Sequence, residues 1–344
     1  GDLMDGKRVG QGKLTLPDGL LYTGAWEDGQ FNGQGMLTQP NGDVYTGTFA
    51  AGRRQGQGHV EYANGDVYDG TFVEDRREGD GTFTGSDGYI YIGDWAAGQI
   101  EGRGQVTYAD GATYEGNWIA GVIDGDGTAV YTNGIVYKGA FKNGLNHGTG
   151  VMTYADGYRY DGEWQEGQRH GKGTATYVDG SVYTGQFQRG KRDGAGEITM
   201  VDGFKYSGNW SDGEISGTGT ATYANGDVYE GQLVAGKRQG KGKVIYENGD
   251  VYEGDFKDDR RDGQGTFTGT DGYVYAGSWV AGQIEGEGRV TYPDGSVYAG
   301  QFRSDLADGT GKITYPDGST YEGEWLAGVI EGKGRATYPN GIVY

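Results

Sequence analysis

The chain has 344 residues, of which 74 are glycine and none is cysteine, and its formal net charge is −20. This charge argues against generic nucleic-acid binding, which needs a basic surface. The absence of cysteine excludes disulfides and thiolate metal sites, and no run of 18 apolar residues is present that could span a bilayer as a helix. Such a glycine content is typical of disordered chains, but the 7 Trp, 28 Tyr and 10 Phe do not fit disorder.

A 23-residue repeat organises the sequence from its first residues to its last. Tyr recurs every 23 residues from Tyr22 to Tyr344, and Gly follows two positions after it at each place from Gly24 to Gly323. Two more glycine columns, two residues apart, are filled in all fifteen repeats, and all seven Trp fall in one column with Phe and Leu. A fixed period of this length is the sequence signature of a repeat architecture.

Each repeat predicts two short antiparallel strands. Residues 102–108 (GRGQVTY) alternate between the two faces of a strand, as do residues 113–118 (TYEGNW). Between them, residues 109–112 (ADGA) carry the Asp-Gly signal of a tight hairpin turn, and residues 119–124 (IAGVID) are expected to connect to the next hairpin. The sequence therefore predicts an all-β fold, an elongated single-layer antiparallel sheet of about fifteen consecutive β-hairpins.

The glycines and the aromatic residues are predicted to be partners across strands. In a single-layer sheet no second layer covers the aromatic face, so a ring can lie flat on main chain that lacks a Cβ. The burial of the ring then offsets the cost of glycine in a strand. Where the second Tyr of the repeat becomes Gly, a nearby Phe and a Tyr beyond the turn are expected to restore the lost bulk, as at Gly85 (Phe83, Tyr89) and Gly269 (Phe267, Tyr273).

The repeat resembles the MORN repeat, named for membrane occupation and recognition nexus. Residues 114–136 (YEGNWIAGVIDGDGTAVYTNGIV) match every fixed position of its pattern, and the resemblance covers residues 1–344 as one continuous array with partial repeats at both ends. It implies a rod or curved half-pipe of hairpins. Members serve mainly as scaffolds and protein-interaction platforms, often as dimers, and several are proposed to bind phospholipids. The departures are Leu233 for the aromatic residue, Asp75, Asp259 and Asp305 for the loop Gly, and Leu16, Gln39 and Met200 for the second Tyr.

The aromatic stripe is the first candidate site. It either forms only the core of the sheet or also lines a groove for a partner peptide, and irregular repeats are where its exposure should differ. The groove candidates are Phe83, Tyr89, Trp95, Tyr114, Trp118, Tyr158, Trp164, Phe204, Trp210, Phe267, Tyr273 and Trp279.

Basic pairs, assigned to the loops between hairpins, are the second candidate site. They could bind a phosphate or an anionic lipid, or they could be solvated charges that pair with neighbouring acids such as Glu74 and Asp258. The candidates are Arg53 with Arg54, Arg76 with Arg77, Lys191 with Arg192, Lys237 with Arg238, and Arg260 with Arg261.

No catalytic site, metal site or cofactor is predicted. The histidines, His59, His147 and His170, are scattered, and the Asp-Gly pairs lack the ligand spacing of a calcium loop. The sequence favours a non-enzymatic scaffold with a protein or peptide partner and no nucleic acid, with homo-oligomerisation through the open ends of the array as an additional expectation. The alternatives are a peripheral module for anionic membrane phospholipids and, third, a glycan-binding surface. A cytoplasmic location, at the cytoskeleton or the inner membrane surface, is the first hypothesis.

Overall fold

All 344 residues are described by the computed structural model, which contains thirty β-strands and no helix. There is accordingly no helix long and apolar enough to cross a membrane. The chain divides into two compact units, Gly1–Gly171 and Lys172–Tyr344, with the boundary inside strand β16 (Gln168–Thr176). The all-β prediction from the sequence is confirmed.

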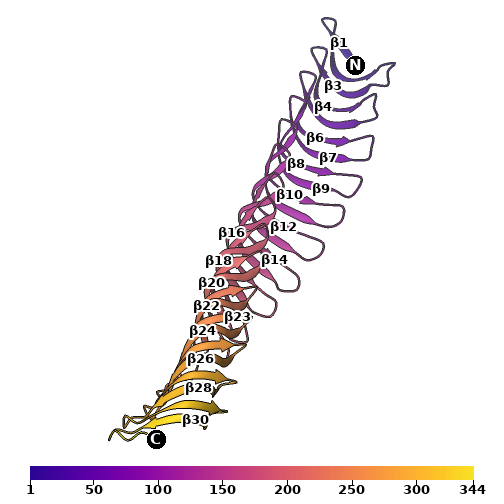
Figure 1. Ribbon diagram of the computed structural model, residues 1–344. Coiled ribbons are helices and arrows are strands. Elements are labelled where there is room, and N and C mark those ends of the chain that lie inside the picture. The colour runs from indigo at the N-terminus through magenta and orange to yellow at the C-terminus, as the bar shows by residue number, and fades with distance from the viewer. The chain divides into compact units, whose positions relative to one another are not determined.

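In the first unit, each strand from β1 to β15 pairs antiparallel with the next one along the chain, so the strands lie side by side in chain order (Figure 1). These strands are β1 (Asp2–Met4), β2 (Lys7–Thr15), β3 (Leu21–Glu27), β4 (Gln30–Thr38), β5 (Val44–Ala50), β6 (Arg53–Glu61), β7 (Val67–Val73), β8 (Arg76–Thr84), β9 (Ile90–Ala96), β10 (Gln99–Thr107), β11 (Thr113–Ile119), β12 (Val122–Val130), β13 (Val136–Lys142), β14 (Leu145–Thr153) and β15 (Arg159–Gln165).

The second unit has the same topology from β17 to β30. Its strands are β17 (Val182–Gln188), β18 (Lys191–Thr199), β19 (Lys205–Ser211), β20 (Glu214–Thr222), β21 (Val228–Val234), β22 (Lys237–Ile245), β23 (Val251–Lys257), β24 (Arg260–Thr268), β25 (Val274–Val280), β26 (Gln283–Thr291), β27 (Val297–Arg303), β28 (Leu306–Thr314), β29 (Thr320–Leu326) and β30 (Val329–Thr337).

Two kinds of turn alternate along each unit, and the sequence interpretation had them reversed. The Asp-Gly segment between β10 and β11 is a wider loop, closed by the Tyr108 N–H donating to the Ala112 carbonyl at 2.8 Å. The segment expected to be a connection is itself a two-residue hairpin turn, with Ala120 at φ 48° and Gly121 at φ 80°. Positive φ at both central residues is the type I′ geometry, which matches the twist of adjacent strands.

Glycine under a ring is the central packing feature of the fold, as the sequence predicts. Tyr45 on β5 is 2% exposed, and a Cβ added to Gly47 of its own strand or to Gly58 of β6 would lie 2.5 Å or 2.6 Å from the Tyr45 hydroxyl oxygen. That hydroxyl donates to the Thr48 carbonyl at 2.9 Å. The ring therefore lies against main chain that only glycine leaves free, because any other residue would place a Cβ where the ring lies.

The two neighbouring glycine columns of each repeat serve different purposes. Gly104 lies beneath a ring, because a Cβ there would be 2.5 Å from Cζ of Tyr91. Gly102 lies in a β-bulge, where the pairing of β10 with β9 shifts between Ile100 and Gly104, and its φ of 73° belongs to the left-handed region. One glycine is required by contact with a ring and the other by backbone geometry.

Edge-to-face ring pairs join each repeat to the next. The Tyr45 ring centre lies 5.0 Å from Phe49 on its own strand and 5.3 Å from Phe72 of the following repeat, with interplanar angles of 82° and 86°. Tyr114 makes the equivalent pairs with Trp118 and Phe141 at 5.5 Å and 5.2 Å. The core of one repeat is thus completed by the aromatic residue of the next one.

Replacing Gly58 by Ala should destabilise the fold by about 1–3 kcal/mol, because the new methyl group must displace the Tyr45 ring or its own strand. Chemical denaturation followed by circular dichroism measures the loss. Gln57→Ala is the matched control, since Gln57 is exposed on the opposite face of the same strand, and its effect should stay within about 0.5 kcal/mol. Equal effects of the two substitutions would contradict the role given to the ring.

Candidate partner-binding face

One face of each unit carries the aromatic residues, and we call it the aromatic face; it is defined by the Tyr45 column, the Phe49 column and the glycines beneath them. Half of the groove candidates from the sequence form its floor. Trp95, Tyr114, Trp118, Trp164, Trp210 and Trp279 are at most 6% exposed. These six rings are packed among their neighbours and present little surface to a partner.

The other six groove candidates are only half-buried and lie nearer to the wider loops. They are Phe83, Tyr89, Tyr158, Phe204, Phe267 and Tyr273. The Tyr89 ring lies 6.1 Å from Phe83 and 6.0 Å from Tyr108. Tyr273 similarly lies 6.2 Å from both Phe267 and Tyr292. The expected size compensation at Gly85 and Gly269 is confirmed, because these rings occupy the place of the missing second Tyr.

The second Tyr of each repeat lines the same side of the aromatic face. We call this column the second tyrosine row; its members are Tyr62, Tyr108, Tyr131, Tyr154, Tyr177, Tyr223, Tyr246, Tyr292, Tyr315 and Tyr338. Tyr131 and Tyr315 are 40% and 37% exposed. The row therefore offers ring surface to the solvent where the Tyr45 column does not.

The basic pairs do not lie in loops, which corrects the expectation from the sequence. Each pair forms the first two residues of a strand (β6, β8, β18, β22 or β24), so its two side chains point to opposite faces. The second member lies on the aromatic face, with the Arg54, Arg192 and Arg261 guanidinium groups 5.0, 4.2 and 4.0 Å from the ring centres of Phe72, Trp210 and Trp279. These are cation–π contacts with the next repeat.

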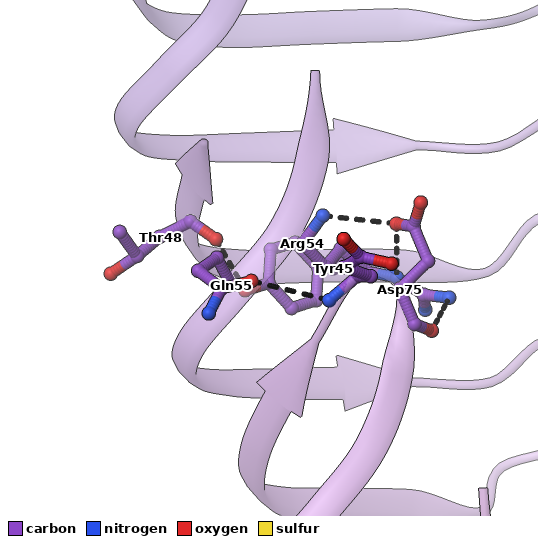
Figure 2. Close-up of polar contacts among 6 residues, drawn as sticks. Tyr45, Thr48, Arg54, Gln55 and Asp75 are labelled. Carbon is purple, nitrogen blue, oxygen red and sulfur yellow. Dashed lines mark hydrogen bonds and ion pairs between the residues drawn. The ribbon is translucent and has the colours of Figure 1, made fainter. Parts of the chain in front are cut away.

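The guanidinium of Arg54 also hydrogen-bonds to the next repeat (Figure 2). Its Nη2 donates to the main-chain oxygen of Asp75 at 2.7 Å and its Nε to the Asp75 carboxylate at 3.2 Å. Arg238 donates to the Asp259 carbonyl at 2.6 Å in the same way. The guanidinium N–H groups used in these hydrogen bonds are not free to bind a phosphate. The second member of each pair therefore serves mainly to connect one repeat to the next.

Asp75 shows why the loop glycine can be replaced. Its φ of 70° is left-handed, and its carboxylate accepts a hydrogen bond from the Arg54 main-chain N–H at 2.9 Å. Asp259 and Asp305 have φ values of 70° and 68° and accept the main-chain N–H groups of Arg238 and Ile284 in the same way. The local hydrogen bond compensates for a backbone conformation that otherwise favours glycine.

A column of acidic or amide side chains also links the repeats, and the sequence interpretation missed it. The Gln55 side-chain oxygen accepts the Glu74 N–H at 3.2 Å across the turn (Figure 2). Equivalent acceptors are Glu78, Glu101, Asp124, Asp193, Gln239, Asp262, Glu285 and Asp308, each bonded to the first residue of the next two-residue turn. Twelve of the fifteen positions in this column carry a side-chain oxygen, the exceptions being Val9, His147 and His170, and this bias was the available signal.

The first members of the basic pairs are exposed and partly neutralised. Arg53 lies 3.3 Å from Glu74 and Lys191 lies 2.5 Å from Asp212, whereas none of the ion pairs includes Arg76, Lys237 or Arg260. The lipid hypothesis therefore concerns five exposed cations that alternate with acids, rather than ten clustered ones.

Comparison with protein-family models gives MORN repeat matches over residues 1–20, 22–44, 45–67, 68–88, 91–113, 114–136, 137–157, 160–182, 183–204, 206–228, 229–251, 252–272, 275–297, 298–320 and 321–343. The chain belongs to the MORN repeat family. Comparison with curated proteins gives no significant match.

Solved structures similar to this MORN-repeat chain are distant. One is the SAS-4 (dCPAP) TCP domain of Drosophila melanogaster in complex with a proline-rich motif of Ana2, at 17% identity and a TM-score of 0.30, covering 50% of this chain and 87% of that one. Another is the TCP10 domain of Danio rerio CPAP in complex with a STIL peptide, at 14% identity and a TM-score of 0.22, covering 97% of both chains. Similarities this low carry no argument about the partners of this chain.

Histidine and acid chemistry is limited on these MORN repeats. His59 lies on the polar face with Nδ1 2.6 Å from the Asp69 carboxylate, and the hydrogen bond to Asp69 raises the pKa of His59. No group of three or more His, Asp or Glu side chains is arranged to hold a metal ion. The His59–Asp69 pair is an exposed polar contact with no nucleophile among its bonded neighbours.

Burial controls the ionisation of the MORN tyrosines. Desolvation raises the pKa of Tyr45 to about 12, against a smaller lowering by the Arg54 charge. Tyr68 and Tyr183 are raised to about 12 by the same cause, with the charges of Arg77 and Arg192 lowering them. The ordinary tyrosine pKa is about 10, so packing keeps these phenols of the Tyr45 column neutral to a higher pH than a free tyrosine.

Alanine at Arg54 should destabilise the MORN array by about 1–3 kcal/mol, because it removes a partly buried cation–π contact and two charge-assisted hydrogen bonds. Alanine at the adjacent Arg53 should change stability by less than about 0.5 kcal/mol, because its ion pair is exposed. Denaturation midpoints of the two variants test this. A larger loss for Arg53→Ala would overturn the assignment of faces.

The array should lose stability as pH rises from about 10 towards 12. The folded-state tyrosine pKa values lie above the unfolded value, so the unfolded chain ionises first and unfolding releases protons in this interval. The stabilisation is complete below about pH 10. A pH titration that follows phenolate absorbance and circular dichroism together should show that the buried tyrosines ionise only as the structure is lost. Ionisation of all the tyrosines near pH 10 with the β-structure retained would contradict it.

Proposed function

We propose that this MORN-repeat chain is a non-enzymatic scaffold that binds protein or peptide partners along its aromatic face. The main support is that similar groups recur there at multiples of 23 residues. In ten of fifteen repeats a tyrosine of the second row lies on one side, and on the other lies the column of Arg54, which holds Arg or an apolar residue in most repeats. A surface that repeats with the chain suits an extended segment that contacts several repeats at once.

The chemistry of this surface is that of a protein interface. Tyrosine and arginine are enriched at the centres of protein–protein contacts, because both combine a large apolar area with polar atoms. On this chain Tyr62 accepts a hydrogen bond from Arg77 at 2.6 Å and remains half-buried. Rigid rings that are already held in place lose little conformational entropy when a partner binds.

The alternative function, binding of anionic phospholipid, rests on the exposed members of the basic pairs. Arg53 begins β6 and Arg76 begins β8, and β7 lies between these two strands. In the other unit Lys237 begins β22 and Arg260 begins β24, with β23 between them. The acidic partners of Arg53 and the net charge of −20 both reduce the attraction to an anionic surface. Homo-oligomerisation through the ends of the array remains a prediction from the sequence.

A photo-crosslinking amino acid at Tyr131, on the aromatic face, should capture partner peptides in cells, whereas the same amino acid at Thr128, on the polar face, should not. Mass spectrometry of the adducts identifies the captured segments. Adducts that form only from position 128 would reject the aromatic face. Flotation with anionic vesicles runs in parallel: co-flotation that is lost in Arg53→Ala/Arg76→Ala would favour the lipid alternative.

A further inference from the structure

A pocket of about 390 Å³ opens on the aromatic face of the first unit. Val60 and Phe72 lie among its apolar lining, and Arg54, Arg77 and Tyr62 supply polar atoms. Gln39 also lines it, and Gln39 is one of the five places where the second tyrosine row is interrupted. Most of the lining is polar or charged, over a small apolar floor, so an occupant should combine an apolar ring with polar atoms.

The molecule contains a second copy of this neighbourhood, 184 positions later along the chain. Arg238, Val244, Tyr246, Phe256 and Arg261 repeat the lining residues in the same order. The one difference among these lining positions is Tyr223, which occupies the position of Gln39. The second copy therefore shows that the same surrounding residues are compatible with a tyrosine at this position.

The loops that carry Gln39 and Tyr223 have the same backbone geometry. The Gln39 N–H donates to the Asp43 carbonyl at 2.8 Å, and the Tyr223 N–H donates to the Asp227 carbonyl at 2.8 Å. The Gly42 and Gly226 N–H groups return to the Gln39 and Tyr223 carbonyls at 2.9 Å in both. The loop backbone is therefore the same in both copies, and the copies differ at this loop in the side chain at position 39 or 223.

Tyr223 packs against an aromatic residue of the preceding repeat. Its ring centre is 5.7 Å from Phe204. Burial raises the pKa of Tyr223, the Arg238 charge lowers it, and the Asp259 charge raises it. In the first unit the equivalent pair, Arg54 and Asp75, borders the pocket with the same link from Arg54 to the Asp75 carbonyl.

Arg77 and its equivalent in the second copy, Arg261, differ in their hydrogen bonds. Arg261 donates to the Gly282 carbonyl at 3.2 Å. Arg77 instead donates to the Tyr62 hydroxyl at 2.6 Å, and the equivalent glycine, Gly98, lines the pocket. The guanidinium of Arg77 stays over the Tyr68 and Trp95 rings at 4.7 and 4.6 Å, so the wall of the pocket is held in place by several contacts.

We propose that the pocket at Gln39 binds a tyrosine side chain of a partner segment. The tyrosine ring of the partner would take the role that the Tyr223 ring has in the second copy. The lining carries donors (Arg54, Arg76 and Arg77) and acceptors (Asp43 and Asp75), so the phenol hydroxyl of the incoming ring can donate or accept a hydrogen bond there. This inference rests on the proposed function and specifies the chemistry of one place on the aromatic face.

The test uses the full chain with methyl-labelled valine and the probe N-acetyl-tyrosinamide. A ring that stacks in the pocket should shift the Val60 methyl resonances with a Kd on the order of 1 mM, as expected for a ligand of this size. The Val244 methyl resonances should not respond, because Tyr223 already occupies the equivalent place. N-acetyl-alaninamide, which lacks the ring, should leave both valines unchanged.

Two reciprocal variants decide the proposal, and each copies a side chain that the other copy already accommodates. Gln39→Tyr should abolish the Val60 response, and Tyr223→Gln should create a new one at Val244. Gln30→Tyr, which adds a tyrosine at an exposed position of β4, the strand that precedes the Gln39 loop, is the matched control and should leave the Val60 response unchanged. No Val60 shift at tenfold higher probe concentration, or a shift that persists in Gln39→Tyr, would overturn the inference.

The outcome is separable from that of the proposed function. Capture of partner segments from Tyr131 with no response at Val60 would reject the tyrosine pocket and leave the scaffold in place. A response at Val60 without any captured partner would establish the pocket and count against the wider partner-binding face.

Discussion

The contact between a tyrosine ring and glycine main chain underlies every other feature of this protein. A sheet of one layer has no second layer to bury its apolar side chains, so it must bury them against itself. The Tyr45 ring does so by lying over Gly47 and Gly58, where a Cβ would leave no room. Since the ring spans two strands and meets Phe72 of the next repeat, the same contact buries the core and joins the repeats.

Polar groups reinforce this junction between repeats at the two-residue turns. Arg54 connects one strand to the turn that contains Asp75, and Gln55 connects the same strand to Glu74. The arginine thus covers the ring of the next repeat and satisfies a main-chain carbonyl at the same time. Much of the charge of the chain is used in such links, so a count of charged residues says little about what the surface binds.

The sequence was sufficient for the repeat, the strands and the pairing of Tyr with Gly, because these follow from a strict period and from alternation. It was misleading about the turns: Asp-Gly at 110–111 looked like the tight one, whereas Ala120 adopts positive φ without a turn signature of its own. It also placed Arg54 in a loop, since a strand that begins with two basic residues has no apolar alternation to reveal it.

For the candidate site, the sequence named the ring columns but could not rank them by exposure. Trp118 and Tyr89 are both aromatic residues of the repeat, yet only Tyr89 retains accessible surface. The difference comes from position along the strand and from what the neighbouring repeat covers, which are tertiary properties. Gln39 was visible as a departure from the repeat, but its meaning required comparison with the geometry around Tyr223.

The dependence of each repeat on its immediate successor has an evolutionary consequence. The ring pairs and arginine links described above reach only the adjacent repeat, for example from Tyr45 to Phe72 and from Arg54 to Asp75. Duplication or loss of a whole 23-residue segment therefore returns every remaining side chain to an equivalent partner. The number of repeats can therefore change in evolution while the chain still folds. The near-identical stretches around Arg77 and Arg261 are consistent with such a duplication.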